Sequence, residues 1–150
     1  MSEKKDMFET KTRWERSCGA VVFTRDGGEV RYVIVENPAG RGHGFPKGHV
    51  ENGETDHETA KREIAEETAL DVRFVGDFRR EVTYPVGIGV MKKVVYFLAE
   101  YSGQSPRARH GEIASVTVLP FDGALAKLER EDARRILCAA DEYVRSLAGD

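Results

Sequence analysis

A capped helix near the middle of the chain is the feature that most restricts how this sequence can fold. Thr55 and Glu58 have the spacing of a capping box, in which each side chain accepts a hydrogen bond from the other residue's backbone N–H. The pattern predicts a helix from Thr55 to about Thr68. Ala60 and Ile64 lie one turn apart on it, so this side should be buried. The rest of the fold must therefore supply an apolar surface for one face of this helix.

Three glutamates crowd the same helix beside its apolar side. Glu63 is a neighbour of both Glu66 and Glu67, because residues three and four apart meet on a helical surface. The three carboxylates fall within an arc of roughly 100°, and the sequence offers them no obvious basic partner three or four residues further along the helix. Two interpretations stay open. Either this is a solvated face built from good helix formers, or the carboxylates hold a divalent cation such as Mg²⁺, which prefers oxygen ligands and often shares phosphate.

The segment before the helix favours the second interpretation. Gly48 and Gly53 are places where the backbone can turn tightly or approach a ligand closely. Lys47 can reach a phosphate as a compact positive charge, and the turn pair Asn52-Gly53 leads Glu54 toward the helix start. A glycine-containing loop followed by a capped, acidic helix suits a metal-bound pyrophosphate.

The remaining chain predicts an α+β fold in which helices pack on a mixed β-sheet. Residues 1–13 are polar and are expected to form a flexible N-terminal arm, and residues 14–150 a single domain. The segment 91–101 is the most hydrophobic strand and should be central. The other expected elements are a hairpin at 21–23 and 30–35, a short strand near Phe45, strands at 70–78, 79–86 and 114–120, and helical structure from Asp122 to about Leu147.

Composition restricts the class of partner. The chain has 150 residues with 26 acidic and 23 basic side chains and a net charge of −3, which argues against nucleic acid as a partner. No apolar run is long enough to span a membrane, and no signal peptide is visible, so a cytoplasmic location is expected. Cys18 and Cys138 are far apart and lack metal-site spacing, which favours two reduced thiols.

The segment from Gly48 to Leu70 resembles the motif of the Nudix family. That motif is Gly, five residues, Glu, seven residues, then Arg-Glu-aliphatic-x-Glu-Glu-x-Gly-aliphatic. Ala69 departs from it, because the family usually has Gly there, and we expect a slightly different helix end with the metal site kept. The matching positions are Gly48, Glu54, Arg62, Glu63, Ile64, Glu66, Glu67 and Leu70.

The resemblance implies an α/β/α sandwich around a mixed sheet. It also implies hydrolysis of a nucleoside diphosphate linked to another group, with Mg²⁺ or Mn²⁺. It implies that Glu54 and Arg62 support each other and hold the loop to the helix, and that Glu63 is a candidate for orienting or deprotonating the attacking water. The implied catalytic residues are Glu54, Arg62, Glu63, Glu66 and Glu67. The implied metal ligands are Glu63, Glu66, Glu67, the Gly48 carbonyl and Glu112.

The segments SCGAVVF, FPKGHVENGE, FRREVTY and KKVVYFLAE are similar to those of the asymmetrical diadenosine tetraphosphate (Ap4A) hydrolases within this family. This similarity implies that Tyr84 stacks on adenine and that Lys47 and Lys92 hold the phosphate chain, with Lys93 beside them. His43 is a further candidate contact to phosphate. Each of these residues has an ordinary alternative role. Tyr84 would be a strand aromatic, the two neighbouring lysines would be solvated charges of a strand, and His43 would be an exposed loop histidine.

Three departures concern the base pocket. These relatives often have an aromatic residue just before the GFPKG segment, where this chain has His43. Val116 and Val118 stand where these relatives usually have aromatic residues, so the base should be held differently. The expected ligand is a small molecule, a dinucleoside polyphosphate or a related nucleotide, cleaved to ATP and AMP in the case of Ap4A. The alternatives are pyrophosphatases for oxidised nucleoside triphosphates, nucleotide sugars, diphosphoinositol polyphosphates or 5′ RNA ends, and a non-catalytic nucleotide sensor. The intact carboxylate set argues against the sensor.

Overall fold

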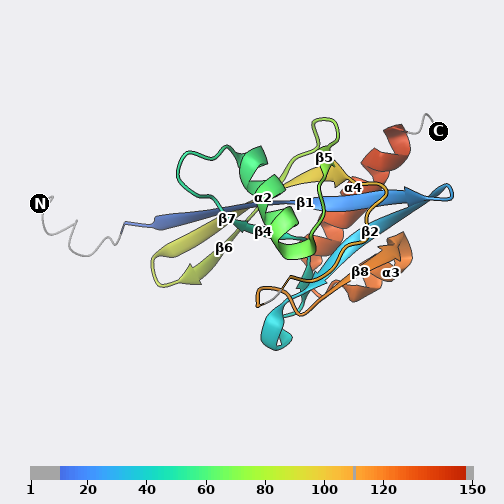
Figure 1. Cartoon of the computed structure of the whole chain (residues 1–150). Helices are drawn as coiled ribbons and strands as arrows, with labels where there is room; N and C mark the ends of the chain where they lie inside the picture. The colour runs from blue at the N-terminus through green and yellow to red at the C-terminus, as the bar shows by residue number, and fades with distance from the viewer. Residues whose placement is uncertain (1–10, 110, 148–150) are drawn as a thin grey trace, which may run out of the picture.

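The computed structural model describes residues 11–109 and 111–147 (Figure 1). The expected N-terminal arm lies mostly outside these residues, and the first strand begins at Arg13. The strands are β1 (Arg13–Asp26), β2 (Glu29–Glu36), β3 (His43–Gly44), β4 (Lys47–His49), β5 (Arg73–Phe74), β6 (Arg80–Gly87), β7 (Val90–Glu100) and β8 (Ser115–Pro120). The helices are the 3₁₀ turn η1 (Pro38–Gly40), α2 (Asp56–Thr68), α3 (Phe121–Lys127) and α4 (Glu131–Leu147).

One mixed sheet of eight strands organises the chain, and β1 and β7 form its centre. These two strands run parallel over eleven paired positions, from Arg13 opposite Val90 to Phe23 opposite Glu100. All other pairings are antiparallel, with β2, β3 and β8 on one side of this centre and β5 and β6 on the other. The central position expected for residues 91–101 is confirmed.

Helices cover both faces of the sheet, as the alternation of side chains along β1 requires. Cys18, Ala20 and Val22 point toward α2 and pack with its buried residues. Val21 and Phe23 point to the opposite face, where α3 and α4 supply the apolar partners. Figure 1 shows α2 in front of the sheet and α4 behind it. The expected α/β/α sandwich is confirmed.

Three expected elements differ in detail. Within 70–78 only Arg73–Phe74 is a strand, and Phe45 lies between β3 and β4. The C-terminal helical segment consists of two helices, because Leu128 adopts an extended conformation and is buried in the core. None of the helices within the described ranges is long and apolar enough to cross a membrane.

The predicted capping box of α2 is confirmed. The Thr55 N–H donates to Glu58 Oε1 at 2.8 Å, and the Glu58 N–H donates to Thr55 Oγ1 at 3.1 Å. At the other end, Ala69 is the C-cap with φ of 63° and ψ of 16°, and its N–H donates to the Ala65 carbonyl at 2.9 Å. Alanine thus adopts the left-handed conformation that a glycine would adopt with less strain.

Ala69→Gly is therefore expected to stabilise the protein by about 1 kcal/mol. An L-residue in the left-handed region costs roughly 1–2 kcal/mol, and glycine avoids this cost. Part of the gain is lost because glycine raises the conformational entropy of the unfolded chain. Urea unfolding measures the change. Ala65→Gly is the control of opposite sign, since glycine inside the helix costs about 1 kcal/mol. Equal destabilisation by both substitutions would contradict this assignment of strain to Ala69.

A buried polar contact holds α4 against the sheet. The Tyr32 hydroxyl of β2 donates to Asp141 Oδ1 at 2.6 Å, and Arg145 Nε donates to Asp141 Oδ2 at 2.7 Å. Tyr32 is fully buried and Asp141 is nearly so. Since a buried carboxylate without partners is costly, this contact fixes where α4 lies and hence where its first residues face.

Candidate active site

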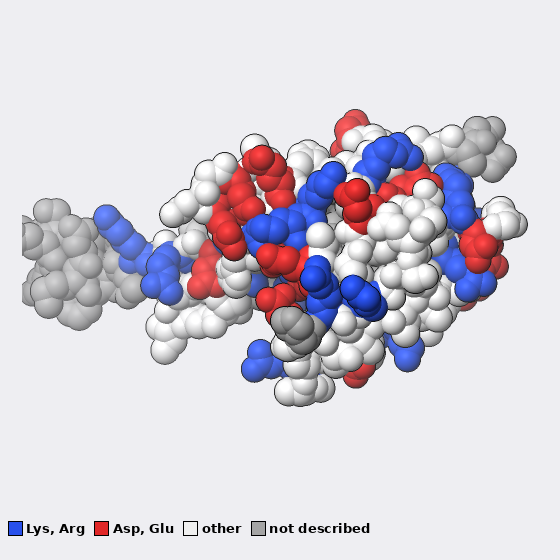
Figure 2. Space-filling view, viewed as in Figure 1, with Lys and Arg blue, Asp and Glu red and all other residues white. Residues whose placement is uncertain are grey.

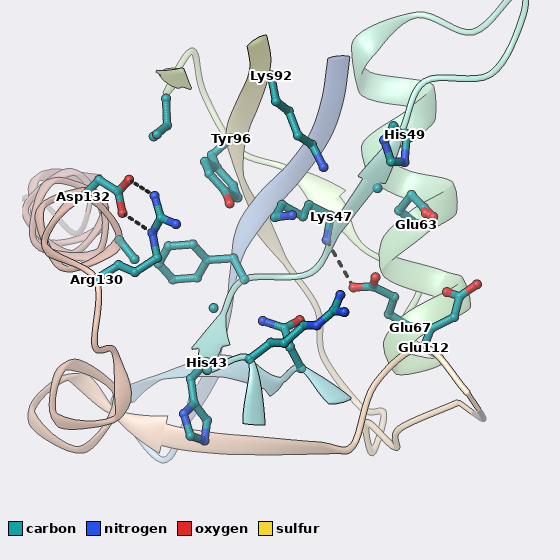
Figure 3. Close-up of a pocket in the computed structure, with 18 of the residues that line it drawn as sticks. His43, Lys47, His49, Glu63, Glu67, Lys92, Tyr96, Glu112, Arg130 and Asp132 are labelled. Atoms are coloured by element: carbon teal, nitrogen blue, oxygen red, sulfur yellow. Dashed lines mark hydrogen bonds and ion pairs between the residues drawn. The ribbon is translucent and has the colours of Figure 1, made fainter. Parts of the chain in front are cut away.

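A cavity of about 1230 Å³ lies along the side of α2 and reaches the start of α4. Figure 3 shows carboxylates of α2 at one end, Arg130 and Asp132 at the other, and Lys47 and Lys92 between them. Figure 2 shows the mixture of acidic and basic side chains that surrounds α2 on the outer surface. The cavity therefore has an acidic end, a cationic middle and a mixed far end.

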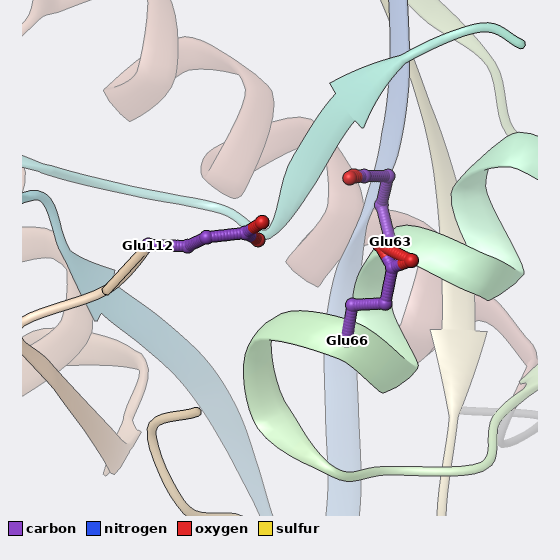
Figure 4. A group of neighbouring side chains, drawn as sticks. All are labelled: Glu63, Glu66 and Glu112. Atoms are coloured by element: carbon purple, nitrogen blue, oxygen red, sulfur yellow. The ribbon is translucent and has the colours of Figure 1, made fainter. Parts of the chain in front are cut away.

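The acidic end brings together residues far apart in the sequence. One carboxylate oxygen each of Glu63, Glu66 and Glu112 lies within 4.8 Å of the others (Figure 4). Glu112 comes from the β7–β8 loop, whose backbone N–H groups at Arg107 and Arg109 donate to carbonyls of the last turn of α2. Those carbonyls lack partners inside the helix, so the loop caps α2 and delivers Glu112 to it.

Gly48 makes room for the buried carboxylate of this group. Strand β4 pairs with β1 and sets Gly48 opposite Cys18. A Cβ on Gly48 would overlap the carboxylate carbon and both oxygens of Glu63. Only a residue without a side chain allows Glu63 to occupy this place.

The donor set fits a hard divalent cation. Glu63 is 8% exposed, and its Oε2 has no hydrogen-bond partner among the described residues. A buried carboxylate oxygen without a partner is unfavourable unless a cation compensates it. Three carboxylates with oxygen ligands this close are the kind of site that Mg²⁺ or Mn²⁺ occupies.

Glu67 lies in the same cavity but outside that close group of carboxylates. Its Oε1 accepts a hydrogen bond from the Lys47 backbone N–H at 3.2 Å. Burial raises the pKa of Glu67 to about 8. The hydrogen bond from Lys47 acts to lower this pKa, and the charge of Glu63 acts to raise it. Burial also raises the pKa of Glu63 to about 7, opposed by Arg62 and reinforced by Glu66.

These pKa values predict how a Glu67→Gln variant behaves without metal. The native carboxyl keeps its proton up to about pH 8, whereas the unfolded one loses it near 4.5. The native state therefore binds more protons in this window, and wild-type stability falls as pH rises through it. Since glutamine does not titrate, the variant should be more stable than wild type above pH 8 and similar to wild type at low pH.

Thermal melts in EDTA across this pH range measure the difference. Excess Mg²⁺ is the internal control, because it should stabilise the wild type more than the variant. A variant that is less stable than wild type in EDTA at high pH would contradict the pKa assigned to Glu67.

Arg62 joins the loop before α2 to the helix. Its guanidinium donates twice to Glu54, at 2.6 and 2.9 Å, and once to the His49 carbonyl at 2.9 Å. It also contacts Glu66 at 3.1 Å across one helical turn. None of the three glutamates has a basic residue three or four positions further along. Glu66 is instead paired with Arg62 one turn before it, so Arg62 contacts both the loop and the helix.

Of the predicted cations, Lys47 and Lys92 line the cavity. Burial lowers the pKa of Lys47, and the nearby Lys92 lowers it further. Lys93 is not brought to the site, because successive residues of β7 face opposite sides of the sheet. Its ammonium lies 3.6 Å from Glu81 and over the ring of Trp14 on the α2 side.

The remaining predicted contacts lie at the far end and rim. Tyr84 lines the cavity together with His43. The His43 imidazole is engaged by Glu129, with Nδ1 2.7 Å from Oε2, and the His43 N–H donates to the other oxygen at 2.9 Å. Val116 and Val118 pack with the cluster on the α2 face, so they do not belong to the described wall of the cavity.

Sequence reasoning missed Arg130 and Asp132. Both line the cavity, and the Arg130 Cζ lies 5.0 Å from the centre of the Tyr84 ring. Neither residue belongs to a motif with fixed spacing to the acidic helix. The only signal in the sequence is a pair of opposite charges at the start of the last helix, which is common at helix ends.

Comparisons with known proteins agree with this geometry. The model of the NUDIX domain matches residues 14–140. The asymmetrical bis(5′-nucleosyl)-tetraphosphatase of Sus scrofa is 31% identical over 144 residues, which cover 89% of this chain and 97% of that protein. The 8-oxo-(d)GTP phosphatase of Mycolicibacterium smegmatis is 32% identical over 143 residues, which cover 89% of this chain and 43% of that protein. This chain therefore spans less than half of the second relative.

Among solved structures, a binary complex of a C. elegans Ap4A hydrolase superimposes with a TM-score of 0.78 at 21% identity. The superposition covers 91% of this chain and 99% of that one. At this level of identity the likeness establishes the fold, and it confirms the arrangement of helices and sheet that the sequence predicts.

Proposed function

The chain belongs to the Nudix hydrolase family, and from this premise we propose that it hydrolyses Ap4A to ATP and AMP with the help of Mg²⁺ or Mn²⁺. The observation that carries the proposal is the single cavity that joins the carboxylates, two lysines and Tyr84. A chain of phosphates needs cations along its length and a flat surface for the base at its end. The similarity to the Sus scrofa enzyme supports the same substrate.

The residues of the acidic end would hold the ion. Glu63, Glu66 and Glu112 are the ligands that the geometry favours. Gly48 lines the same cavity, and its carbonyl is the further ligand that the family resemblance implies. A bound divalent cation supplies charge neutralisation at the phosphate oxygens and lowers the pKa of a bound water. In the free protein these carboxylates repel one another, and a bound cation would relieve this repulsion.

The protein's own groups position the substrate and accept a proton. Lys47 and Lys92 bind the phosphate oxygens in the middle of the cavity and orient the chain. A water oxygen attacks a phosphorus near one end of the chain, the new P–O bond forms, and the bridging P–O bond breaks so that ATP and AMP separate. Glu67 faces the cavity outside the close group of carboxylates. A cation held by the neighbouring carboxylates would favour the ionised form of Glu67, and we assign this carboxylate as the acceptor of the water proton.

A substrate panel with Mg²⁺ tests the proposal. The panel contains Ap4A, 8-oxo-dGTP, a nucleotide sugar, a diphosphoinositol polyphosphate and a capped RNA. Ap4A should show the highest kcat/KM and give ATP and AMP in equal amounts. Faster turnover of a mononucleotide than of Ap4A would overturn the choice of substrate, and binding without turnover of any compound would indicate a nucleotide sensor.

An oxidised purine nucleoside triphosphate is the second candidate substrate. The similarity to the Mycolicibacterium smegmatis 8-oxo-(d)GTP phosphatase extends along most of this chain. The cavity features used for Ap4A would serve such a substrate as well, because it also combines a base with several phosphates. The same panel decides between them, since 8-oxo-dGTP would then have the higher kcat/KM and release pyrophosphate.

A further inference from the structure

The linker between α3 and α4 forms the far end of the cavity. Glu129 binds His43 through both its imidazole and its backbone N–H, which ties the linker to the segment before β4. Arg130 lies over the ring of Tyr84. Asp132 then accepts two hydrogen bonds from Arg130, from Nε at 3.1 Å and from Nη2 at 2.8 Å. Asp132, in the first turn of α4, thus holds the Arg130 guanidinium in a fixed plane.

Arg130 occupies the surface that sequence similarity assigns to the base. Its Cζ lies 5.0 Å from the centre of the Tyr84 ring. A base inserted between the two groups would need two van der Waals layers, about 7 Å in total. With Arg130 in this place, the base cannot also lie on this face of Tyr84.

The Arg130 guanidinium stays accessible from the cavity. The Arg130 side chain is 58% exposed although it lines the cavity. Its two bonds to Asp132 lie in the guanidinium plane and leave both faces free for stacking. Since Cζ lies over the Tyr84 ring, a planar group that enters the cavity can stack on the side of the guanidinium away from that ring.

We propose that Arg130 is a specificity-determining residue, whose guanidinium stacks on the nucleobase at the far end of the phosphate chain. Asp132 positions it and Tyr84 supports it from behind. The proposal rests on the proposed nucleotide substrate, and it explains how a base is held where Val116 and Val118 supply no aromatic ring to the cavity. Guanidinium groups stack on flat π-systems, whereas an ammonium group lacks the plane needed to do so.

The competing role for Arg130 is that of a simple positive charge for phosphate. Arg130→Lys separates the two, because lysine keeps the charge and removes the plane. The measurement is calorimetric titration with ATP and, separately, with inorganic tripolyphosphate, both in Mg²⁺. The ratio of the two dissociation constants reports the contribution of the nucleoside and requires no hydrolysis.

Wild type should bind ATP more tightly than tripolyphosphate. Arg130→Lys should weaken ATP binding about ten-fold, in the range known for the loss of one stacked base, and change tripolyphosphate binding much less. Arg130→Ala should weaken both. Arg135→Lys in the adjoining helix α4 is the matched control, since Arg135 is outside the wall of the cavity and pairs with Glu131, and it should leave the ratio unchanged.

Three results would overturn the proposal. The first is a wild type without preference for ATP over tripolyphosphate. The second is an equal loss for both ligands in Arg130→Lys, which would make Arg130 a phosphate contact. The third is ATP binding that is unchanged or tighter in Arg130→Ala, which would show that Arg130 only covers Tyr84. Failure of Ap4A hydrolysis in the substrate panel leaves this ratio measurable, so the two proposals can fail separately.

Discussion

Glu63→Gln is expected to lower kcat/KM for hydrolysis about 10³-fold, the scale observed when one preorganised electrostatic contact to a transition state is removed. Glu63 is the most buried of the clustered carboxylates, and one of its oxygens has no partner among the described residues. Glutamine keeps the shape of the side chain, so the fold should persist. What it removes is one of the negative charges that would hold the cation.

The control for Glu63→Gln is a substitution of the same kind on the same helix. Glu58→Gln should change kcat/KM by less than about two-fold, because glutamine serves a capping box as well as glutamate does. Both variants should be assayed over a wide range of Mg²⁺ concentration, with circular dichroism as a check of folding. Activity of Glu63→Gln close to wild type at every Mg²⁺ concentration would contradict a role of Glu63 in holding the ion.

Gly48→Ala is expected to reduce kcat/KM at least ~10²-fold, comparable with the loss of a group that orients a metal ligand. The added methyl group would overlap the Glu63 carboxylate, which must then leave its place between β4 and the other two carboxylates. Gly87→Ala is the matched control, since that glycine is also in a strand and a Cβ there has nothing within 4 Å. It should retain full activity.

A double mutant connects the two predictions. If Gly48→Ala acts through Glu63, adding it to Glu63→Gln should cause little further loss, because effects through one group are not additive. If the fold-losses in kcat/KM of the two single variants multiply in the double variant, Gly48 contributes instead through its carbonyl or through the backbone conformation of β4. Measurement of kcat/KM for the three variants and wild type decides this.

The sequence predicts the acidic end of the site well because its parts are local. The capping box, the helix and the preceding glycine loop lie within one short segment, and helical geometry alone places Glu63 beside Glu66. Glu112 comes from another part of the chain, and only the resemblance to a family indicated it. Its placement depends on hydrogen bonds between the β7–β8 loop and the end of α2, which spacing cannot reveal.

The far end of the cavity was less predictable, because contacts between distant segments also bring its residues together. Arg130 and Asp132 enter the cavity because Asp141 and Tyr32 fix α4 on the sheet and because the chain breaks between α3 and α4 at Leu128. These are tertiary contacts between distant residues. Lys93 is a different case. It belongs to a strand that the sequence predicts, and the alternation of side chains along that strand points Lys93 to the face of the sheet opposite Lys92.

The parallel pairing of β1 with β7 has a consequence for biosynthesis. The first strand leaves the ribosome early, yet its central partner begins only at Val90, after α2 has been made. Contacts between such distant segments form late, because a long loop must first be closed. A nascent chain that ends before β7 therefore carries the acidic helix without the sheet that buries it. We expect hydrolysis to appear only when β7 and the loop with Glu112 have both emerged, so shorter fragments should be inactive.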